Sequence, residues 1–217
     1  MKAGNVKVKI CGITSLADAL AACGAGADAL GFVFYRKSPR YIEPKSAKKI
    51  IAELPPFVSI VGVFVDEDIG RIKDITSVAG IDYAQLHGSE PPGTVAALGR
   101  RAIKAFRIKD ASSIEEVNRS GLDMVMLDSH TEGYGGSGQR FDYSLIKGLA
   151  GNIRFILSGG ITPDNVCDIA NAYRPYAIDV SSGVEISPGK KSKEKIKLLF
   201  GNLRTSCKSF YESLDMK

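Results

Sequence analysis

The sequence contains no tryptophan, and it has only two histidines and four cysteines in 217 residues. The cysteines form no CxxC pair and are widely spaced, which argues against both a disulfide framework and a zinc site. The two histidines, His87 and His130, are too far apart in the sequence to suggest a ligand pair. We therefore expect a reduced, cytoplasmic protein that holds no metal ion.

Long apolar runs and a strong charge of one sign are also absent. No stretch of about 18 apolar residues occurs, so we expect no membrane span, and Met1 to Ile10 lacks the apolar core of a secretory signal. The chain has 29 basic and 24 acidic residues. Its one basic cluster, Lys190 to Lys197, is interrupted by Glu194 and is interpreted as a solvated helix face, which argues against nucleic-acid binding. The small positive surplus is compatible with an anionic small-molecule substrate.

Short apolar runs recur along the chain, and each is followed by a segment that can be helical. The runs begin near Val6, Ala29, Ser59, Tyr83, Ala102, Asp123, Ile153 and Tyr176. Runs such as 60–65 are continuously apolar, as is typical of strands buried on both faces. This alternation predicts parallel βαβ units. Eight of them fit a closed (β/α)8 barrel better than an open doubly wound sheet. We predict a single barrel domain over 1–204 and a C-terminal extension of unknown role over 205–217, past the last helix.

Two clusters of serine and glycine come late in the chain. Ser158-Gly159-Gly160 follows the seventh predicted strand and Ser181-Ser182-Gly183 follows the eighth. The loops after these two strands often hold a phosphate in such barrels, because glycine lets backbone N–H groups approach an anion closely. Gly136 and Gly138, in the long loop after the sixth strand, are further candidate donors or part of a lid. Tight turns at the strand ends are the alternative interpretation.

Two residues at predicted strand ends are candidates for acid–base chemistry. Asp128 follows the apolar run 124–127. A partly desolvated carboxyl there can keep its proton near neutral pH and act as a general acid, although it can also simply cap the next loop. Cys11 ends the first strand, where it is either a small buried hydrophobe or a base. A base needs a nearby cation or donor to lower its pKa. We expect strand alternation to point Lys9 away from it.

Four further polar residues follow predicted strands. Gln85 and His87 end the fourth strand, and Asp179 ends the eighth. Arg40 lies in the loop after the second strand. It can bind a carboxylate or phosphate through two hydrogen bonds, or it can be an ordinary surface arginine.

Several short segments, taken together and in chain order, indicate a resemblance to a known family. They include Lys9-Ile10-Cys11-Gly12-Ile13-Thr14, Ser38-Pro39-Arg40-Tyr41-Ile42, Gln85-Leu86-His87-Gly88, Leu127-Asp128 and the serine-glycine clusters. In this order the chain resembles the phosphoribosylanthranilate isomerase family of tryptophan biosynthesis, over about residues 7–197. The resemblance implies an Amadori rearrangement of N-(5′-phosphoribosyl)anthranilate to 1-(2-carboxyphenylamino)-1-deoxyribulose 5-phosphate, with no cofactor.

The resemblance also implies residue roles. Cys11 is implied to be the general base and Asp128 the general acid, while Arg40 and Asp179 position the substrate and the glycine-rich segments bind its phosphate. We place Gln85 and His87 with the substrate-binding residues. The chemistry agrees with this division, because ring opening needs an acid at the ring oxygen and the resulting iminium needs a base at C2′.

Two other functions compete with this one. A histidine-pathway barrel isomerase carries out a similar rearrangement, but it is expected to use two aspartates, and Cys11 argues against it. A catalytically silent barrel that binds a phosphate ligand or a protein is less consistent with the presence of both Cys11 and Asp128. Both a monomer and a homodimer are compatible with the sequence.

Overall fold

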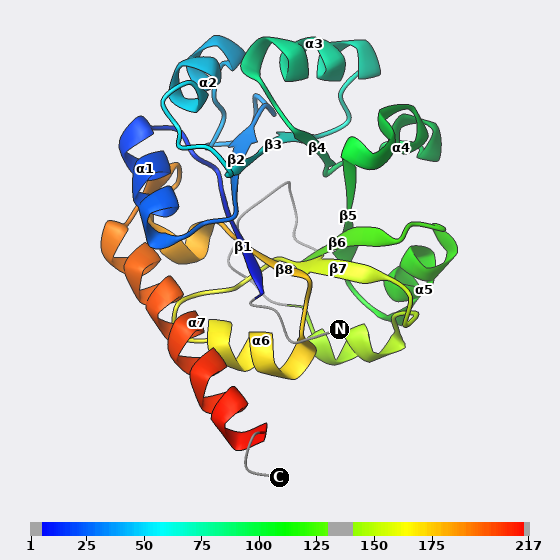
Figure 1. Ribbon diagram of the computed structural model, residues 1–217. Coiled ribbons are helices and arrows are strands. Elements are labelled where there is room, and N and C mark those ends of the chain that lie inside the picture. Colours follow the sequence, from blue (N-terminus) through cyan, green and yellow to red (C-terminus); the bar gives the residue numbers. More distant parts are fainter. Residues whose placement is uncertain (1–5, 130–140, 215–217) are drawn as a thin grey trace.

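The computed structural model describes residues 6–129 and 141–214, with side chains described to residue 204. Eight parallel strands close into a barrel in the order β1 to β8 (Figure 1). The strands are β1 (Lys7–Cys11), β2 (Ala29–Val33), β3 (Ser59–Phe64), β4 (Tyr83–Leu86), β5 (Ala102–Ile108), β6 (Met124–Ser129), β7 (Arg154–Leu157) and β8 (Ala177–Val180). The ring closes because β1 pairs with both β2 and β8. The predicted (β/α)8 barrel is confirmed, and each predicted strand start lies within one residue of the observed start.

Helices surround the strand ring on its outer side (Figure 1). The α-helices are α1 (Leu16–Ala25), α2 (Pro44–Ile51), α3 (Ile69–Ala79), α4 (Pro92–Leu98), α5 (Ala111–Arg119), α6 (Val166–Tyr173) and α7 (Lys193–Leu214). The described residues between β6 and β7 form the 3-10 helix η2 (Tyr143–Gly148) where a regular helix was expected. Short 3-10 helices also form at Gly99–Arg101 (η1) and Ser182–Val184 (η3). A small antiparallel hairpin, β9 (Glu185–Ser187) with β10 (Lys190–Lys191), precedes α7.

Local sequence signals explain where helices begin and end. Ser15 caps α1, because its side chain accepts a hydrogen bond from the N–H of Asp18. Gly26 ends the same helix in the left-handed conformation that glycine adopts without strain. Pro44 occupies the first turn of α2, where its fixed φ suits the helix and its missing N–H leaves no bond unmade.

The two faces of the strands have different environments. Outward side chains such as Ile10, Phe32 and Leu127 are buried in one large apolar core shared with the helices. Inward side chains form smaller clusters, one of them made of Cys11, Val33 and Val63. Alternate residues of a strand share a face. The outer face of the strands therefore packs against the helices, whereas the inner face also carries polar side chains.

The last helix is longer than expected. The backbone stays helical from Lys193 to Leu214, so the predicted boundary between residues 204 and 205 falls within α7. Figure 1 shows this helix leaving the side of the barrel and projecting past it.

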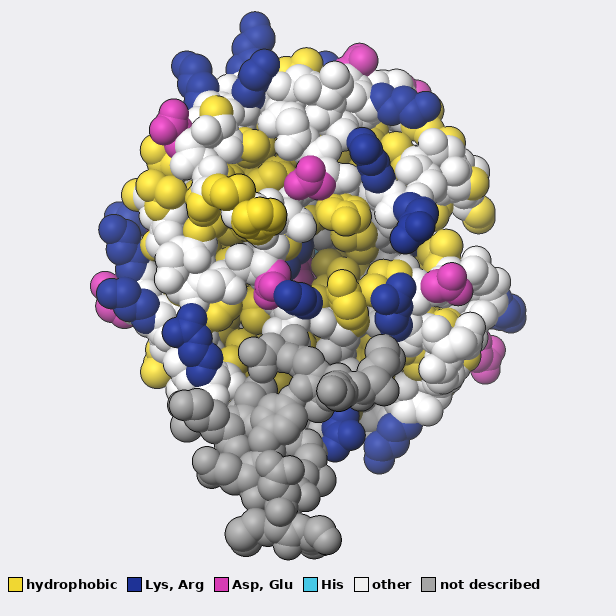
Figure 2. Space-filling view, in the orientation of Figure 1, with side chains coloured by type: hydrophobic (Ala, Val, Ile, Leu, Met, Phe, Trp, Pro, Cys, Tyr) yellow, Lys and Arg dark blue, Asp and Glu magenta, His cyan; other side chains and the backbone are white. Residues whose placement is uncertain are grey.

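Charged side chains are dispersed on the face seen in Figure 2. Lys and Arg lie mostly around its edge rather than in one patch, with hydrophobic side chains between them. Within the described residues, no helix combines the length and the apolar character that crossing a bilayer requires.

Candidate active site

Cys11 is the last residue of β1 and its side chain is buried inside the ring. Gly31 on β2 makes room for it, since a Cβ atom at Gly31 would lie 2.7 Å from the Cys11 Sγ. Burial raises the pKa of the Cys11 thiol above its ordinary value, and the positive charges of Lys9 and Lys191 offset only part of this increase. Cys11 is therefore held as a thiol.

Lys9 points into the barrel together with Cys11, so the expectation that it points away is wrong. The two residues are two positions apart on one strand and therefore share a face. The Lys9 Nζ lies 3.0 Å from Asp179 Oδ1 on β8 and 2.8 Å from Gln85 Oε1 on β4. Burial lowers the pKa of Lys9, but attraction to Asp179 and Cys11 outweighs burial and raises it overall. Lys9 is thus a buried ammonium group at the centre of the site.

Gln85 and His87 extend this contact to Asp128. Gln85 Nε2 lies 2.8 Å from His87 Nδ1, and His87 Nε2 lies 3.0 Å from Asp128 Oδ2. One hydrogen-bonded chain therefore runs from Asp179 and Lys9 through Gln85 and His87 to Asp128. It joins strands β8, β1, β4 and β6, which the sequence separates widely.

The protonation expected for Asp128 is not the one found. Burial raises the pKa of its carboxyl group, but the hydrogen bond and the electrostatic attraction of His87, together with hydrogen bonds from the Ser129 backbone N–H and the Ser158 side chain, outweigh burial and lower the pKa below its ordinary value. The prediction of a carboxyl that keeps its proton near neutral pH is therefore wrong. The sequence pattern indicated desolvation but not these donors.

Arg40 lies inside the protein and pairs with Glu185, so it is not an ordinary surface arginine. It is buried, with Nε 2.9 Å from Glu185 Oε1 and Nη2 2.7 Å from Glu185 Oε2. Lys191 Nζ lies 2.8 Å from the same carboxylate and also donates to the Cys11 carbonyl. Lys191 is almost fully buried and belongs to β10, so the interpretation of its cluster as a solvated helix face is wrong for this residue.

The two serine-glycine clusters lie side by side. A Cβ atom at Gly183, after β8, would lie 1.9 Å from the Ile161 carbonyl oxygen, after β7. Gly159 and Gly160 both have positive φ, at 91° and 64°, which a residue with a side chain rarely adopts. Ser181 donates from its hydroxyl to the Cys11 carbonyl, and Ser182 opens η3. Gly136 and Gly138 lie outside the described residues.

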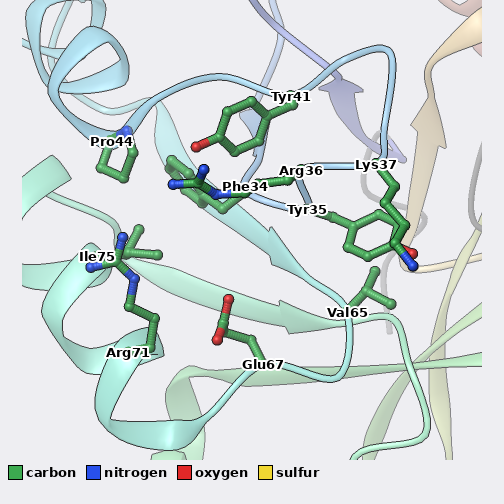
Figure 3. A pocket seen from close by; sticks show the side chains of 10 residues that line it. All are labelled: Phe34, Tyr35, Arg36, Lys37, Tyr41, Pro44, Val65, Glu67, Arg71 and Ile75. Carbon is green, nitrogen blue, oxygen red and sulfur yellow. The ribbon is translucent and has the colours of Figure 1, made fainter.

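A separate cavity of about 220 Å³ lies where β2 and β3 end, next to α2 and α3 (Figure 3). Aromatic and basic side chains line it, among them Tyr41, Arg36 and Arg71, and the Arg36 guanidinium lies 5.8 Å from the centre of the Tyr41 ring. None of the predicted site residues lines this cavity, so it is distinct from the chain that ends at Asp128.

Lys9, Glu185 and Lys191 are functional candidates that were not selected from the sequence. Lys9 had a usable signal, because a lysine two residues before a candidate base on the same strand must share its face. Glu185 and Lys191 had none, since Glu185 pairs with Arg40 across 145 residues and Lys191 donates to the Cys11 carbonyl across 180 residues. Within the described residues, no three His, Cys, Asp or Glu side chains cluster as metal ligands would.

Comparison with known proteins identifies the family. The model described as N-(5′phosphoribosyl)anthranilate (PRA) isomerase matches residues 8–202. The N-(5′-phosphoribosyl)anthranilate isomerase of a Geobacter species is 48% identical over 192 residues, covering 88% of this chain and 94% of that protein. The crystal structure of phosphoribosyl anthranilate isomerase from Thermotoga maritima is similar with a TM-score of 0.87 at 46% identity, covering 92% of this chain and 99% of that chain.

Two further solved structures carry additional information. One shows monomers generated from the dimeric Thermotoga maritima enzyme, with a TM-score of 0.83 at 41% identity. The other is a phosphoribosyl anthranilate isomerase in complex with reduced 1-(o-carboxyphenylamino)-1-deoxyribulose 5-phosphate, with a TM-score of 0.82 at 41% identity. Both cover 92% of this chain and 99% of the compared chain. With most of its length matched in sequence and in fold, this chain belongs to the N-(5′-phosphoribosyl)anthranilate isomerase family.

Proposed function

We propose that this chain isomerises N-(5′-phosphoribosyl)anthranilate to 1-(2-carboxyphenylamino)-1-deoxyribulose 5-phosphate. The observation that carries the proposal is the hydrogen-bonded chain that runs from Lys9 through Gln85 and His87 to Asp128, with the Cys11 thiol beside Lys9 on the same face of β1. It brings one thiol and one carboxyl group to the strand ends at which barrel enzymes do their chemistry. A relative at 41% identity binds a reduced form of this product, which supports the same substrate class here.

The reaction needs one acid and one base. Asp128 donates a proton to the furanose ring oxygen as the C1′–O bond breaks, which leaves an iminium at C1′. Cys11, as thiolate, then removes the C2′ proton, and the resulting enolamine tautomerises to the ketone. The pKa directions of the two groups favour the opposite distribution, with Cys11 as thiol and Asp128 as carboxylate. The reactive form has the same number of protons, so reaching it requires only that one proton leave Cys11 and one join Asp128.

The remaining predicted residues hold the substrate. The adjacent loops after β7 and β8, with Ser158, Gly159, Gly160, Ser181, Ser182 and Gly183, form the proposed phosphate site. Gly136 and Gly138 are proposed to contribute to it as well. Arg40 has five N–H donors, of which Glu185 accepts two, so the others can bind the anthranilate carboxylate. Asp179 is proposed to position the sugar while it also anchors Lys9.

A direct assay tests the proposal. Purified protein is mixed with freshly generated N-(5′-phosphoribosyl)anthranilate, and the loss of anthranilate-type fluorescence is followed for wild type and for Cys11→Ala. We expect rapid loss in wild type and none in the variant, while the variant still binds the reduced product analogue. Loss of binding as well would make Cys11 a structural residue. No loss in either protein would contradict the proposal and favour the histidine-pathway substrate or a silent binder.

Assembly is a second property to be tested. The dimeric Thermotoga maritima relative makes a homodimer the better-supported alternative to a monomer. Light scattering coupled to size-exclusion chromatography distinguishes the two states. The described cysteines, Cys11, Cys23 and Cys167, are unpaired, which supports the proposed cytoplasmic location.

A further inference from the structure

The hydrogen bonds between Lys9 and His87 have only one possible direction. A lysine ammonium group donates hydrogen bonds and cannot accept them. The Gln85 group that faces Lys9 must therefore be its carbonyl oxygen, which lies 2.8 Å from Nζ. The amide nitrogen of Gln85 then faces His87 Nδ1 at 2.8 Å and donates to it. An amide rotated by half a turn would place its NH2 group against the ammonium group.

The direction determines where His87 carries its proton. Nδ1 accepts from Gln85, so it cannot carry a hydrogen of its own. The single proton of a neutral imidazole is then on Nε2, which lies 3.0 Å from Asp128 Oδ2 and donates to that carboxylate. We propose that Lys9 acts through Gln85 to hold His87 as the neutral Nε2–H tautomer, and that this keeps Asp128 usable as the acid. The second part rests on the function proposed above.

Burial makes this orientation stable. Lys9 is 4% exposed and Gln85 is 1% exposed, so water cannot replace a reversed contact. If the Gln85 NH2 group faced the Lys9 ammonium group here, both donors would be buried without an acceptor, which costs free energy. Lys9 is itself held by Asp179 on the neighbouring strand β8, where the two residues are paired in register. Asp179 thus fixes the position of Lys9 independently of Gln85.

The tautomer matters because Asp128 must exchange a proton. A neutral Nε2–H donor stabilises the carboxylate that remains after Asp128 has protonated the ring oxygen. An imidazolium would add a full positive charge 3.0 Å from Asp128 Oδ2, which would lower the pKa of that carboxyl further and oppose the proton uptake that the acid role requires. Lys9 and Gln85 are therefore positioning residues that act through His87, and neither needs to touch the reacting atoms for this role.

Gln85→Glu is the sharpest test, because it keeps the shape and makes both terminal atoms acceptors. Glutamate still accepts from Lys9, but it also requires a proton on His87 Nδ1. Nitrogen NMR of protein labelled with 15N-histidine reports both ring nitrogens, and the His87 signals are those lost in His87→Gln. We expect wild type at neutral pH to show an unprotonated Nδ1 and a protonated Nε2, and Gln85→Glu to show both nitrogens protonated. Turnover should fall by about 10²-fold, with little change in KM.

A double variant tests whether Lys9 sets the orientation of the Gln85 amide. Lys9→Met alone leaves a buried carboxylate unpaired and can fail to fold, so it is combined with Asp179→Asn. In this double variant Gln85 loses its fixed direction, and the wild-type single tautomer should become a mixture. Gln85→Met removes both hydrogen bonds at similar volume and controls for packing. If Gln85→Met and Gln85→Glu lose the same turnover and the tautomer of His87 is unchanged in both, the role of Gln85 is merely structural.

The results separate this inference from the proposed function. A wild-type His87 with its proton on Nδ1, or with both nitrogens protonated, would overturn the inference even if the protein turns over substrate. If His87 keeps the single Nε2–H tautomer in the double variant, Lys9 does not set the orientation of Gln85. A protein with the Nε2–H tautomer but without activity would contradict the proposed function and leave the orientation of His87 by Lys9 intact.

Discussion

Arg40 and Glu185 form a buried ion pair through two hydrogen bonds, of 2.9 and 2.7 Å, across 145 residues of sequence. Lys191 shares the same carboxylate and also contacts the carbonyl of Cys11. The pair therefore ties the loop after β2 and the hairpin after β8 to the end of β1. The position of Arg40, a predicted substrate contact, and that of the Cys11 backbone therefore depend on this cluster.

Glu185→Gln should destabilise the protein, because it leaves two buried cations without their carboxylate. Removing one partner of a buried pair costs about 3–5 kcal/mol of unfolding free energy. Urea unfolding measures the loss. Glu43→Gln is the matched control, since Glu43 lies 4.0 Å from Arg36 in an exposed pair and its removal should cost less than about 1 kcal/mol. Equal effects of the two substitutions would show that the buried cluster does not contribute to stability.

The contribution of Glu185 should depend on pH. Burial raises the pKa of its carboxyl group, but Arg40 and Lys191 outweigh burial and lower it overall. A group with a lowered folded-state pKa stabilises the protein above its unfolded pKa, about 4.3 for glutamate, and loses this contribution as the pH falls through the folded value. The difference in unfolding free energy between wild type and Glu185→Gln should thus be largest near neutral pH and shrink below about pH 4. A difference that grows on acidification would refute this assignment.

Asp128→Asn should lower kcat at least about 10²-fold, because it preserves shape but removes the proton that the ring oxygen needs. The loss is measured by the fluorescence assay under saturating substrate. Asp142→Asn is a suitable comparison, since Asp142 caps η2 through the Ser144 N–H and is exposed. Near-normal kcat in Asp128→Asn would remove this residue from the acid role.

Gly183→Ala should weaken phosphate binding, because its Cβ atom would lie 1.9 Å from the Ile161 carbonyl oxygen and the two loops must move apart. Misplacement of this size can cost up to about 10²-fold in catalytic efficiency, and we expect the loss mainly in KM and in affinity for the reduced product analogue. Gly24→Ala is the control, since nothing lies within 4 Å of a Cβ atom there and alanine favours the helix α1. Unchanged affinity in Gly183→Ala would exclude these loops from the phosphate site.

Local patterns in the sequence were enough for the barrel itself. Apolar runs mark the strands because each strand is buried against the surrounding helices, and Ser15, Gly26 and Pro44 mark helix ends through interactions within a few residues. The segment between β6 and β7 was the exception, because its described part forms the 3-10 helix η2. The positions of Cys11 and Asp128 at strand ends also followed from pattern alone.

Only the tertiary structure decided what surrounds these two residues. Lys9 reaches Gln85, and His87 reaches Asp128, across strands that do not pair, so these contacts depend on how the ring closes. The lowered pKa of Asp128 depends on donors from β4 and from the loop after β7, and Arg40 finds Glu185 only after the barrel has formed. A sequence specifies which side chains face inward, because that follows from residue spacing along one strand. Which of them meet, and with what charge, follows from distances between strands that only the closed barrel sets.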